Sequence, residues 1–151
     1  MGFGEHLLTS QTFVPRARAE VFAFFANAEN LEAITPPELR FEIATPVPIR
    51  IGEGTRIEYR LRLFGVPFTW ASLISEWDEG SAFVDEQVRG PYAFWVHQHA
   101  FFDAPGGTRV EDRVRYRLPL FPLGELAHPL VRRQLGRIFD YRATRLRELL
   151  G

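Results

Sequence analysis

Two histidines and one aspartate have types and spacing that could do chemistry. His97 and His99 are separated by one residue in a run that alternates like a β-strand, so both imidazoles are expected on one side of it. Asp112 lies in the next strand-like run, 108–118, at a position that alternates with arginines and belongs to the apolar set. We therefore predict that Asp112 points into the core.

The loop between these two runs decides whether the histidines face Asp112. A two-residue loop at Pro105-Gly106, or a four-residue loop over 104–107, places His99 directly opposite Asp112. Directly opposed residues share a face of the sheet, so the sequence predicts a buried pair of His99 and Asp112. A loop with an odd number of residues would reverse the face of the His-x-His run.

Three roles fit such a pair. The first is structural, because a buried carboxylate is stable only when it is paired and hydrogen-bonded. The second is the polar end of a ligand cavity, since binding pockets combine an apolar lining with a few convergent polar groups. The third is catalytic, with His99 oriented by Asp112 as a general base for proton abstraction next to a carbonyl. His99 and Asp112 are the candidate catalytic residues.

The cavity hypothesis takes its residues from one face of several strand-like runs. Asp85 and Gln87 belong to this face if the turn at Glu79-Gly80 has two residues, whereas a three-residue turn would place Val84 and Val88 inside. The predicted ligand-binding residues are Tyr59, Phe68, Trp70, Asp85, Gln87, Trp95, His97, His99, Phe101, Asp112 and Tyr116.

A metal ion is a further use for two histidines and a carboxylate. The sequence shows no additional group that would orient the imidazoles of His97 and His99 from behind. We therefore predict no metal and no other cofactor. The remaining histidines, His6 and His128, are expected at the surface or at a helix end.

The elements that must position these residues follow from hydrophobic periodicity. A first strand is predicted over 5–14, followed by two short helices over 18–27 and 31–34. Strands with period two follow from residue 40 to 118, joined by connections so short that neighbours must be antiparallel. In the first clear hairpin we expect a turn over 64–67 that pairs Leu63 with Phe68.

The last segment, 124–150, returns to helical spacing, with one face formed by Val131, Leu135, Ile138, Arg142, Leu146 and Leu149. Pro129 is compatible with the first turn of this helix. At ~1.5 Å per residue the helix would exceed 30 Å, enough to cross the whole sheet.

Composition excludes several classes of function. The chain has 151 residues, enough for one domain, and a formal net charge of −1, which gives no support for nucleic acid as a partner. It contains no cysteine, and all 18 basic residues are arginine, so thiolate, Schiff-base and P-loop lysine chemistry are excluded. No run approaches the ~20 apolar residues of a membrane span. We expect a cytoplasmic protein.

The order of strand, two short helices, six strands and a long helix resembles the helix-grip fold of the START-like superfamily, which includes polyketide cyclase/dehydrase proteins. The runs from Phe83 to Phe101, Gly106 to Asp112, Tyr116 to Pro119 and Arg132 to Arg142 resemble a bacterial branch that also occurs beside sugar-nucleotide-epimerase-like domains. The resemblance implies one α+β domain over 1–151, with a curved antiparallel sheet wrapped around the C-terminal helix.

The function that this resemblance implies is binding of a small hydrophobic or amphipathic molecule between the sheet and the last helix. One alternative is an aromatase/cyclase-like acid–base enzyme that uses His99 and Asp112. Another is an interaction module, as a homodimer or with an epimerase-like partner, in which the outward residues Phe94, Val96 and Phe102 form the contact.

Overall fold

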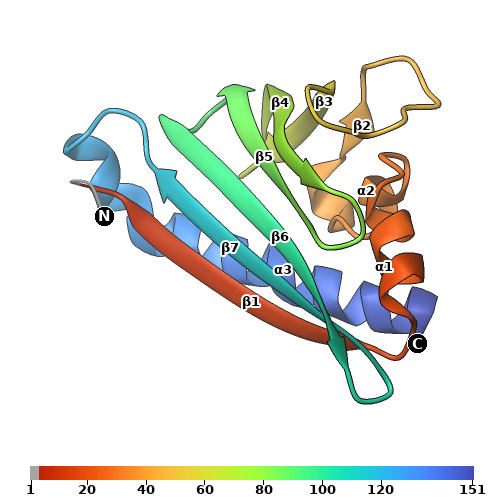
Figure 1. Ribbon diagram of the computed structural model, residues 1–151. Helices are drawn as coiled ribbons and strands as arrows, with labels where there is room; N and C mark the ends of the chain where they lie inside the picture. The colour runs from red at the N-terminus through yellow and green to blue at the C-terminus, as the bar shows by residue number, and fades with distance from the viewer. Residues whose placement is uncertain (1–3) are drawn as a thin grey trace.

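The protein is built on one antiparallel sheet, seen in the computed structural model of Figure 1, which describes residues 4–151. The sheet has seven strands in the order β1-β7-β6-β5-β4-β3-β2. Consecutive strands from β2 to β7 are antiparallel neighbours, as predicted from their connections. Strand β1 joins the sheet beside β7, a pairing that the sequence did not indicate. The strands are β1 (His6–Val14), β2 (Glu42–Ile43), β3 (Arg56–Leu63), β4 (Val66–Asp78), β5 (Ala82–Arg89), β6 (Phe94–Ala104) and β7 (Gly107–Arg117).

The helices come in two groups. After β1 the chain forms α1 (Arg18–Phe25), α2 (Asn30–Ala33) and a short 3-10 turn η1 (Pro37–Leu39). After β7 a second 3-10 turn, η2 (Leu123–Ala127), leads into the long helix α3 (His128–Leu150), which crosses one face of the sheet in Figure 1. Two short helices after the first strand and one long C-terminal helix confirm the predicted α+β helix-grip architecture.

Both the start of helix α3 and the face that it turns to the core agree with its sequence. Pro129 lies in the first turn, where a backbone N–H would have no intrahelical acceptor, so its absence breaks no hydrogen bond of the helix. The buried side chains of α3 are Leu135, Phe139, Arg142 and Leu146, which recur at three- and four-residue spacing. Leu149, predicted on the same face, is 41% exposed, and the next residue, Leu150, packs against the core instead.

The turn between β3 and β4 differs from the predicted one. Phe64 and Gly65 both have positive φ angles, 53° and 76°, as a two-residue type I′ turn requires, and Leu63 pairs with Val66. The predicted pairing of Leu63 with Phe68 is therefore wrong by two residues. A shift of two preserves the face of every side chain, so Tyr59 and Trp70 share a face as predicted, and Trp70 rather than Ser72 is the residue directly opposite Tyr59.

The turn between β4 and β5 has three residues, since Asp78 pairs with Ala82. On the sequence argument this turn alone would have turned Asp85 away from the core. A β-bulge between Ile74 and Glu76 shifts the register by one residue, so that Ile74 pairs with Asp85 after all. The bulge thus places Asp85 on the inner face, while Val88 is 43% exposed.

The hairpin of β6 and β7 has the predicted two-residue loop at Pro105-Gly106, with Ala104 opposite Gly107. Gly106 has a φ of 79°, a conformation that costs glycine little. The register places His99 opposite Asp112, as predicted.

The core between the sheet and the helices contains two groups of buried hydrophobic side chains. One surrounds α1 and includes Phe22, Phe25 and Phe101. The other joins the sheet to α3 through Trp95, Leu135 and other residues. No helix among residues 4–151 is long and apolar enough to span a membrane.

Candidate functional site

A cavity of about 170 Å³ lies between the sheet and α3. Its wall is mostly aliphatic and aromatic, and polar side chains gather in a few places on it. The lining residues are Phe25, Leu31, Leu39, Phe41, Ile51, Ile57, Tyr59, Leu61, Leu63, Trp70, Ser72, Ile74, Phe83, Asp85, Tyr92, Trp95, His97, His99, Leu135, Ile138, Phe139 and Arg142.

Six of the predicted ligand-binding residues line this cavity, namely Tyr59, Trp70, Asp85, Trp95, His97 and His99. Five do not, namely Phe68, Gln87, Phe101, Asp112 and Tyr116. Sharing a face of the sheet is therefore not sufficient, because α1, α3 and neighbouring side chains cover part of that face.

The five residues away from the cavity have other contacts. Phe101 packs against the rings of Phe22 and Phe25 at centroid distances of 5.1 and 5.3 Å. The Gln87 amide makes two hydrogen bonds with the backbone of Tyr92, at 2.7 and 3.0 Å, which hold the β5–β6 connection. Phe68 packs on the second hydrophobic cluster.

The hydroxyl of Tyr116 lies 3.0 Å from Nε2 of His128. Tyr116 therefore contacts the beginning of α3 rather than the cavity.

Asp112 lies behind the histidines, and its side chain is only 5% exposed. Its Oδ1 accepts hydrogen bonds from His97 Nε2 at 2.7 Å and from Arg142 Nη2 at 3.1 Å. The predicted hydrogen-bonded pair of His99 and Asp112 is thus corrected: the residues are opposed, but His99 Nδ1 is 3.5 Å from Oδ1. The hydrogen bonds to Oδ1 of Asp112 come from Arg142 and His97 instead.

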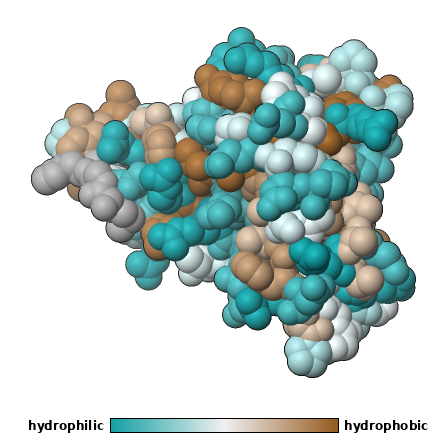
Figure 2. Space-filling model, viewed as in Figure 1, coloured by the Kyte–Doolittle hydropathy of each residue, from teal (hydrophilic) through white to brown (hydrophobic). Residues whose placement is uncertain are grey.

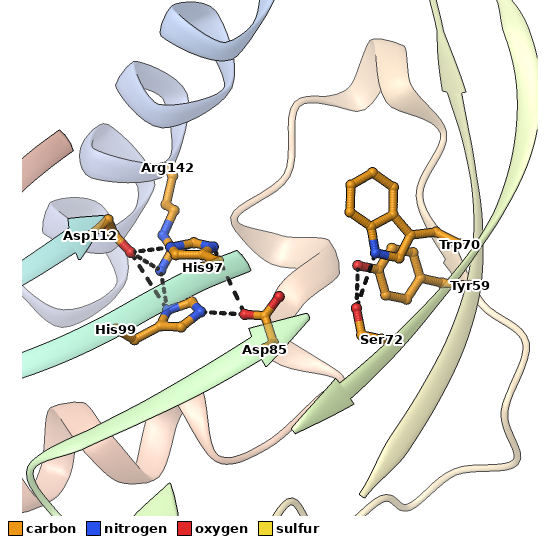
Figure 3. Close-up of polar contacts among 8 residues, drawn as sticks. All are labelled: Tyr59, Trp70, Ser72, Asp85, His97, His99, Asp112 and Arg142. Atoms are coloured by element: carbon orange, nitrogen blue, oxygen red, sulfur yellow. Dashed lines mark hydrogen bonds and ion pairs between the residues drawn. The ribbon is translucent and has the colours of Figure 1, made fainter. Parts of the chain in front are cut away.

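His99 is hydrogen-bonded on both ring nitrogens. Arg142 Nη2, which can only donate, lies 3.2 Å from His99 Nδ1, so Nδ1 is the acceptor. Nε2 then carries the proton and donates to Asp85 Oδ2 at 2.5 Å. The rings of His97 and His99 stack with centroids 3.7 Å apart, and His97 Nδ1 is 3.8 Å from the same Asp85 oxygen. Figure 3 shows these contacts as one connected group.

Burial and neighbouring charges set the protonation of this group. Burial and the adjacent His97 lower the pKa of His99 to about 4, so the ring is neutral at neutral pH. Burial opposes ionisation of Asp112, but the Arg142 charge and the His97 hydrogen bond outweigh it and hold the pKa of Asp112 below its usual range. The pKa of Asp85 is also lowered, because the His99 hydrogen bond and nearby positive charge outweigh its burial.

A second polar group faces the first across the cavity in Figure 3. The indole of Trp70 donates to Ser72 Oγ at 3.1 Å, and the Tyr59 hydroxyl lies 3.2 Å from the same oxygen. Burial raises the pKa of Tyr59, and the charge of Asp85 adds to that rise, so this phenol stays protonated. The cavity therefore offers ionised and neutral polar groups on different walls.

Arg142, Ser72 and Tyr92 line the cavity but were not among the predicted site residues. The signal for Arg142 was available, because an arginine on the apolar stripe of a helix needs a buried partner. Ser72 shares the inner face with Trp70, so its position was predictable, although its role as a hydrogen-bond centre was not. Tyr92 lies in the β5–β6 connection, where periodicity gives no direction.

Within residues 4–151, two groups of side chains each bring together three atoms that could bind a metal. One group is Asp85, His97 and His99; the other is His6, Glu125 and His128. Asp112 stands behind His97 as a carboxylate that could orient it. The first group is nevertheless poorly suited to a cation. A metal on His99 Nε2 would require a proton on Nδ1, which faces the donor of Arg142 at 3.2 Å. The prediction of a site without metal stays a prediction.

No protein-family model matches the sequence, and no curated protein matches it. Solved structures do. The aromatase/cyclase Zhui from Streptomyces sp. R1128 superposes with a TM-score of 0.78 at 13% identity, over 97% of this chain and 93% of that chain. A START superfamily protein from Mycobacterium smegmatis superposes with a TM-score of 0.73 at 12% identity, over 96% and 97%. The chain has the START-like fold.

A third match concerns a larger protein. Part of the nucleoside-diphosphate sugar epimerase from Corynebacterium glutamicum superposes on this chain with a TM-score of 0.67 at 27% identity. The match covers 93% of this chain but only 28% of that one. This fold is therefore similar to one segment of a longer chain as well as to chains that it covers almost completely.

Proposed function

We propose that this protein binds a small hydrophobic or amphipathic molecule in the cavity between the sheet and α3. The observation that supports this most is the composition of the cavity wall, an aromatic and aliphatic lining with polar groups confined to two places. Such a wall removes apolar surface of a ligand from water, worth ~25 cal/mol per Å², while the polar groups fix its orientation.

Binding of toluene tests this proposal without assuming any polar contact. Toluene should raise the melting temperature in a saturable manner, because a ligand that binds only the folded state stabilises it. The variant Leu61→Phe places a larger side chain in the cavity wall and should abolish the rise. The control Leu126→Phe makes the same change at a residue that is 84% exposed and should leave the rise intact. A toluene effect that is equal in both variants would contradict the proposal.

An acid–base enzyme is the second candidate, and the pairing of His99 with a carboxylate at the cavity wall favours it. The carboxylate is Asp85 rather than the predicted Asp112. However, both nitrogens of His99 are hydrogen-bonded within the protein, to Asp85 and to Arg142, so neither is open to remove a proton from a ligand. These contacts argue against His99 as the base and leave Nδ1 of His97, 3.8 Å from Asp85 Oδ2, as the imidazole nitrogen without a hydrogen bond. We favour binding over catalysis on the apolar character of the cavity wall.

The interaction module is less well supported. Arginine guanidinium groups lie over two of its predicted contact residues, Arg109 over Phe102 at 4.7 Å and Arg115 over Phe94 at 5.3 Å. The face seen in Figure 2 mixes hydrophilic and hydrophobic residues and shows no continuous apolar surface. A homodimer, an epimerase-like partner, the absence of nucleic-acid binding and a cytoplasmic location stay predictions from the sequence.

A further inference from the structure

The polar end of the cavity brings together more carboxylates than guanidinium groups. It contains two carboxylates, Asp85 and Asp112, and one guanidinium, Arg142. The guanidinium contacts Asp112, with Nη2 to Oδ1 at 3.1 Å, and so compensates the carboxylate that lies behind the cavity wall. Asp85 takes its one hydrogen bond from His99, which is neutral at neutral pH. Of the two carboxylates, Asp85 is therefore the one without a guanidinium contact, and its other polar neighbour is His97, whose Nδ1 lies 3.8 Å from Oδ2.

Asp85 also presents an open oxygen to the cavity. Its side-chain hydrogen bond and ion pairs with other described residues use Oδ2, which lies 2.5 Å from His99 Nε2 and 3.8 Å from His97 Nδ1. Figure 3 shows the second oxygen directed away from the imidazoles, toward the side where Tyr59 and Ser72 lie. The Asp85 side chain is 18% exposed, compared with 5% for Asp112. A carboxylate oxygen that is accessible and only an acceptor calls for a donor on the ligand.

Aromatic rings at several orientations line the same cavity. Trp70 and Trp95 are perpendicular, with centroids 5.3 Å apart. Tyr92 lies 4.8 Å from Trp95, and Tyr59 is stacked with Trp70 at 6.1 Å. The faces of such rings attract cations through their quadrupoles, most strongly where water is excluded. Rings together with a carboxylate form the usual arrangement for recognising an ammonium group.

The volume limits the rest of the ligand. At about 170 Å³, the cavity is comparable to the roughly 150 Å³ engineered apolar cavity that binds benzene. It therefore accommodates a molecule of about one ring with a short substituent.

We propose that the ligand is a small protonated amine with an apolar body of about one ring, whose ammonium group binds the open oxygen of Asp85 while the ring packs among the aromatic side chains of the cavity. This proposal rests on the function proposed above, since it specifies the chemical class of ligand for the same cavity.

Three probes with the same ring and different charge test the proposal on the unmodified protein: benzylamine, benzyl alcohol and benzoate, measured by calorimetry at pH 7. Benzylamine should bind at least about tenfold more tightly than benzyl alcohol, because a charge-assisted hydrogen bond in a buried site is stronger than a neutral one. Benzoate should bind most weakly, because its carboxylate would face Asp85.

The variant Asp85→Asn removes the charge at nearly constant shape. It should lose the preference for benzylamine and retain the affinity for benzyl alcohol. The control Asp103→Asn makes the same change at a side chain that is 81% exposed and should retain the preference. If Asp85→Asn does not fold, the three probes on the unmodified protein still decide.

Two failures are distinguishable. Binding of benzyl alcohol or benzoate as tight as that of benzylamine would overturn the amine proposal and leave the apolar cavity function intact. If none of the three probes, nor toluene, bound at all, the proposed binding function itself would be wrong. A preference for benzylamine that persists in Asp85→Asn would place its recognition elsewhere and would also overturn the proposal.

Discussion

Two stacked pairs of imidazoles occur in this protein, in different surroundings. His97 and His99 stack at 3.7 Å on the wall of the cavity, next to Asp85 and Asp112. His6 and His128 stack at 3.6 Å where the start of β1 meets the start of α3, with His6 Nε2 2.7 Å from Glu125. We call these the inner and the outer pair.

The two pairs contain similar side chains but differ in burial and in counter-charge. The inner imidazoles are 6% and 4% exposed, whereas in the outer pair His6 is 21% exposed and its partner Glu125 is 28% exposed. The inner pair also has a buried guanidinium, that of Arg142. Because electrostatic interactions strengthen as water is excluded, the same chemical groups should matter far more for stability, and for a ligand, in the inner pair.

The largest difference should appear on removing a carboxylate. Asp112→Ala leaves buried Arg142 and His97 without their acceptor and should cost about 3–5 kcal/mol of unfolding free energy. Glu125→Ala at the outer pair should cost about 1 kcal/mol or less, since its partner is partly solvated. Urea unfolding of both variants measures the two values. Equal losses would show that burial does not distinguish the pairs.

A double variant separates a structural from a functional role of this carboxylate. Asp112→Leu combined with Arg142→Met replaces both buried charges and should recover much of the loss, because no unpaired charge remains. The pair of His99 and Asp112 predicted from the sequence would have suggested a different double variant, one that leaves Arg142 buried without a partner. If the double variant folds but no longer binds toluene or benzylamine, the buried charges also serve the cavity.

The pH dependence of stability should come next in size. His99 has a pKa of about 4 in the folded protein against an ordinary value of 6.5, so acid protonates the unfolded chain first. Stability should therefore fall as the pH is lowered from about 6.5 to about 4, by on the order of 3 kcal/mol. Below that range the lowered pKa values of Asp85 and Asp112 add a further loss, because those carboxylates must then be protonated.

Chemical unfolding at pH 7.5 and pH 5.0 measures this effect. His99→Gln should remove most of the difference between the two pH values. His128→Gln should remove less of it, because His128 is partly solvated, although burial and His6 lower its pKa as well. A larger effect of His128→Gln would reverse the comparison between the pairs.

Much of the inner pair was predictable because it depends on strand register. Alternation identified the inner face, and the two-residue loop at Pro105-Gly106 placed His99 opposite Asp112. The position of Asp85 was not decidable in this way. It depends on a three-residue turn and a bulge at residue 75 that cancel one another, and no residue type in that stretch demands a bulge.

Hydrogen-bond partners were less predictable than positions. Opposed residues in a sheet are neighbours, yet Asp112 hydrogen-bonds to His97 rather than to His99, because Arg142 from α3 lies between them. The outer pair was not predicted at all. His6 and His128 are far apart in sequence, and their contact depends on how α3 crosses the sheet, which periodicity within each segment does not specify.

A smaller effect is expected from the aromatic wall. Trp95→Ala should weaken toluene binding by on the order of 1 kcal/mol or more, because it removes an aromatic surface from the cavity wall. His128→Ala at the outer pair removes a stacked ring that does not line the cavity and should leave the affinity unchanged. Calorimetric titration of both variants checks this. An equal change in both would mean that the cavity wall is not where toluene binds.

The smallest expected effect is that of metal, for which we predict no change at either pair. At the inner pair the Arg142 donor faces His99 Nδ1 at 3.2 Å, so a metal on Nε2 would place two donors against each other. At the outer pair Nε2 of His6 already binds Glu125, and Nε2 of His128 lies 3.0 Å from the Tyr116 hydroxyl. Chelator treatment should leave the melting temperature unchanged, and zinc should not raise it. If zinc does raise it, His128→Gln and His97→Gln show which pair is responsible: loss of the rise in His97→Gln alone would mean that the buried cluster can rearrange around a cation despite Arg142.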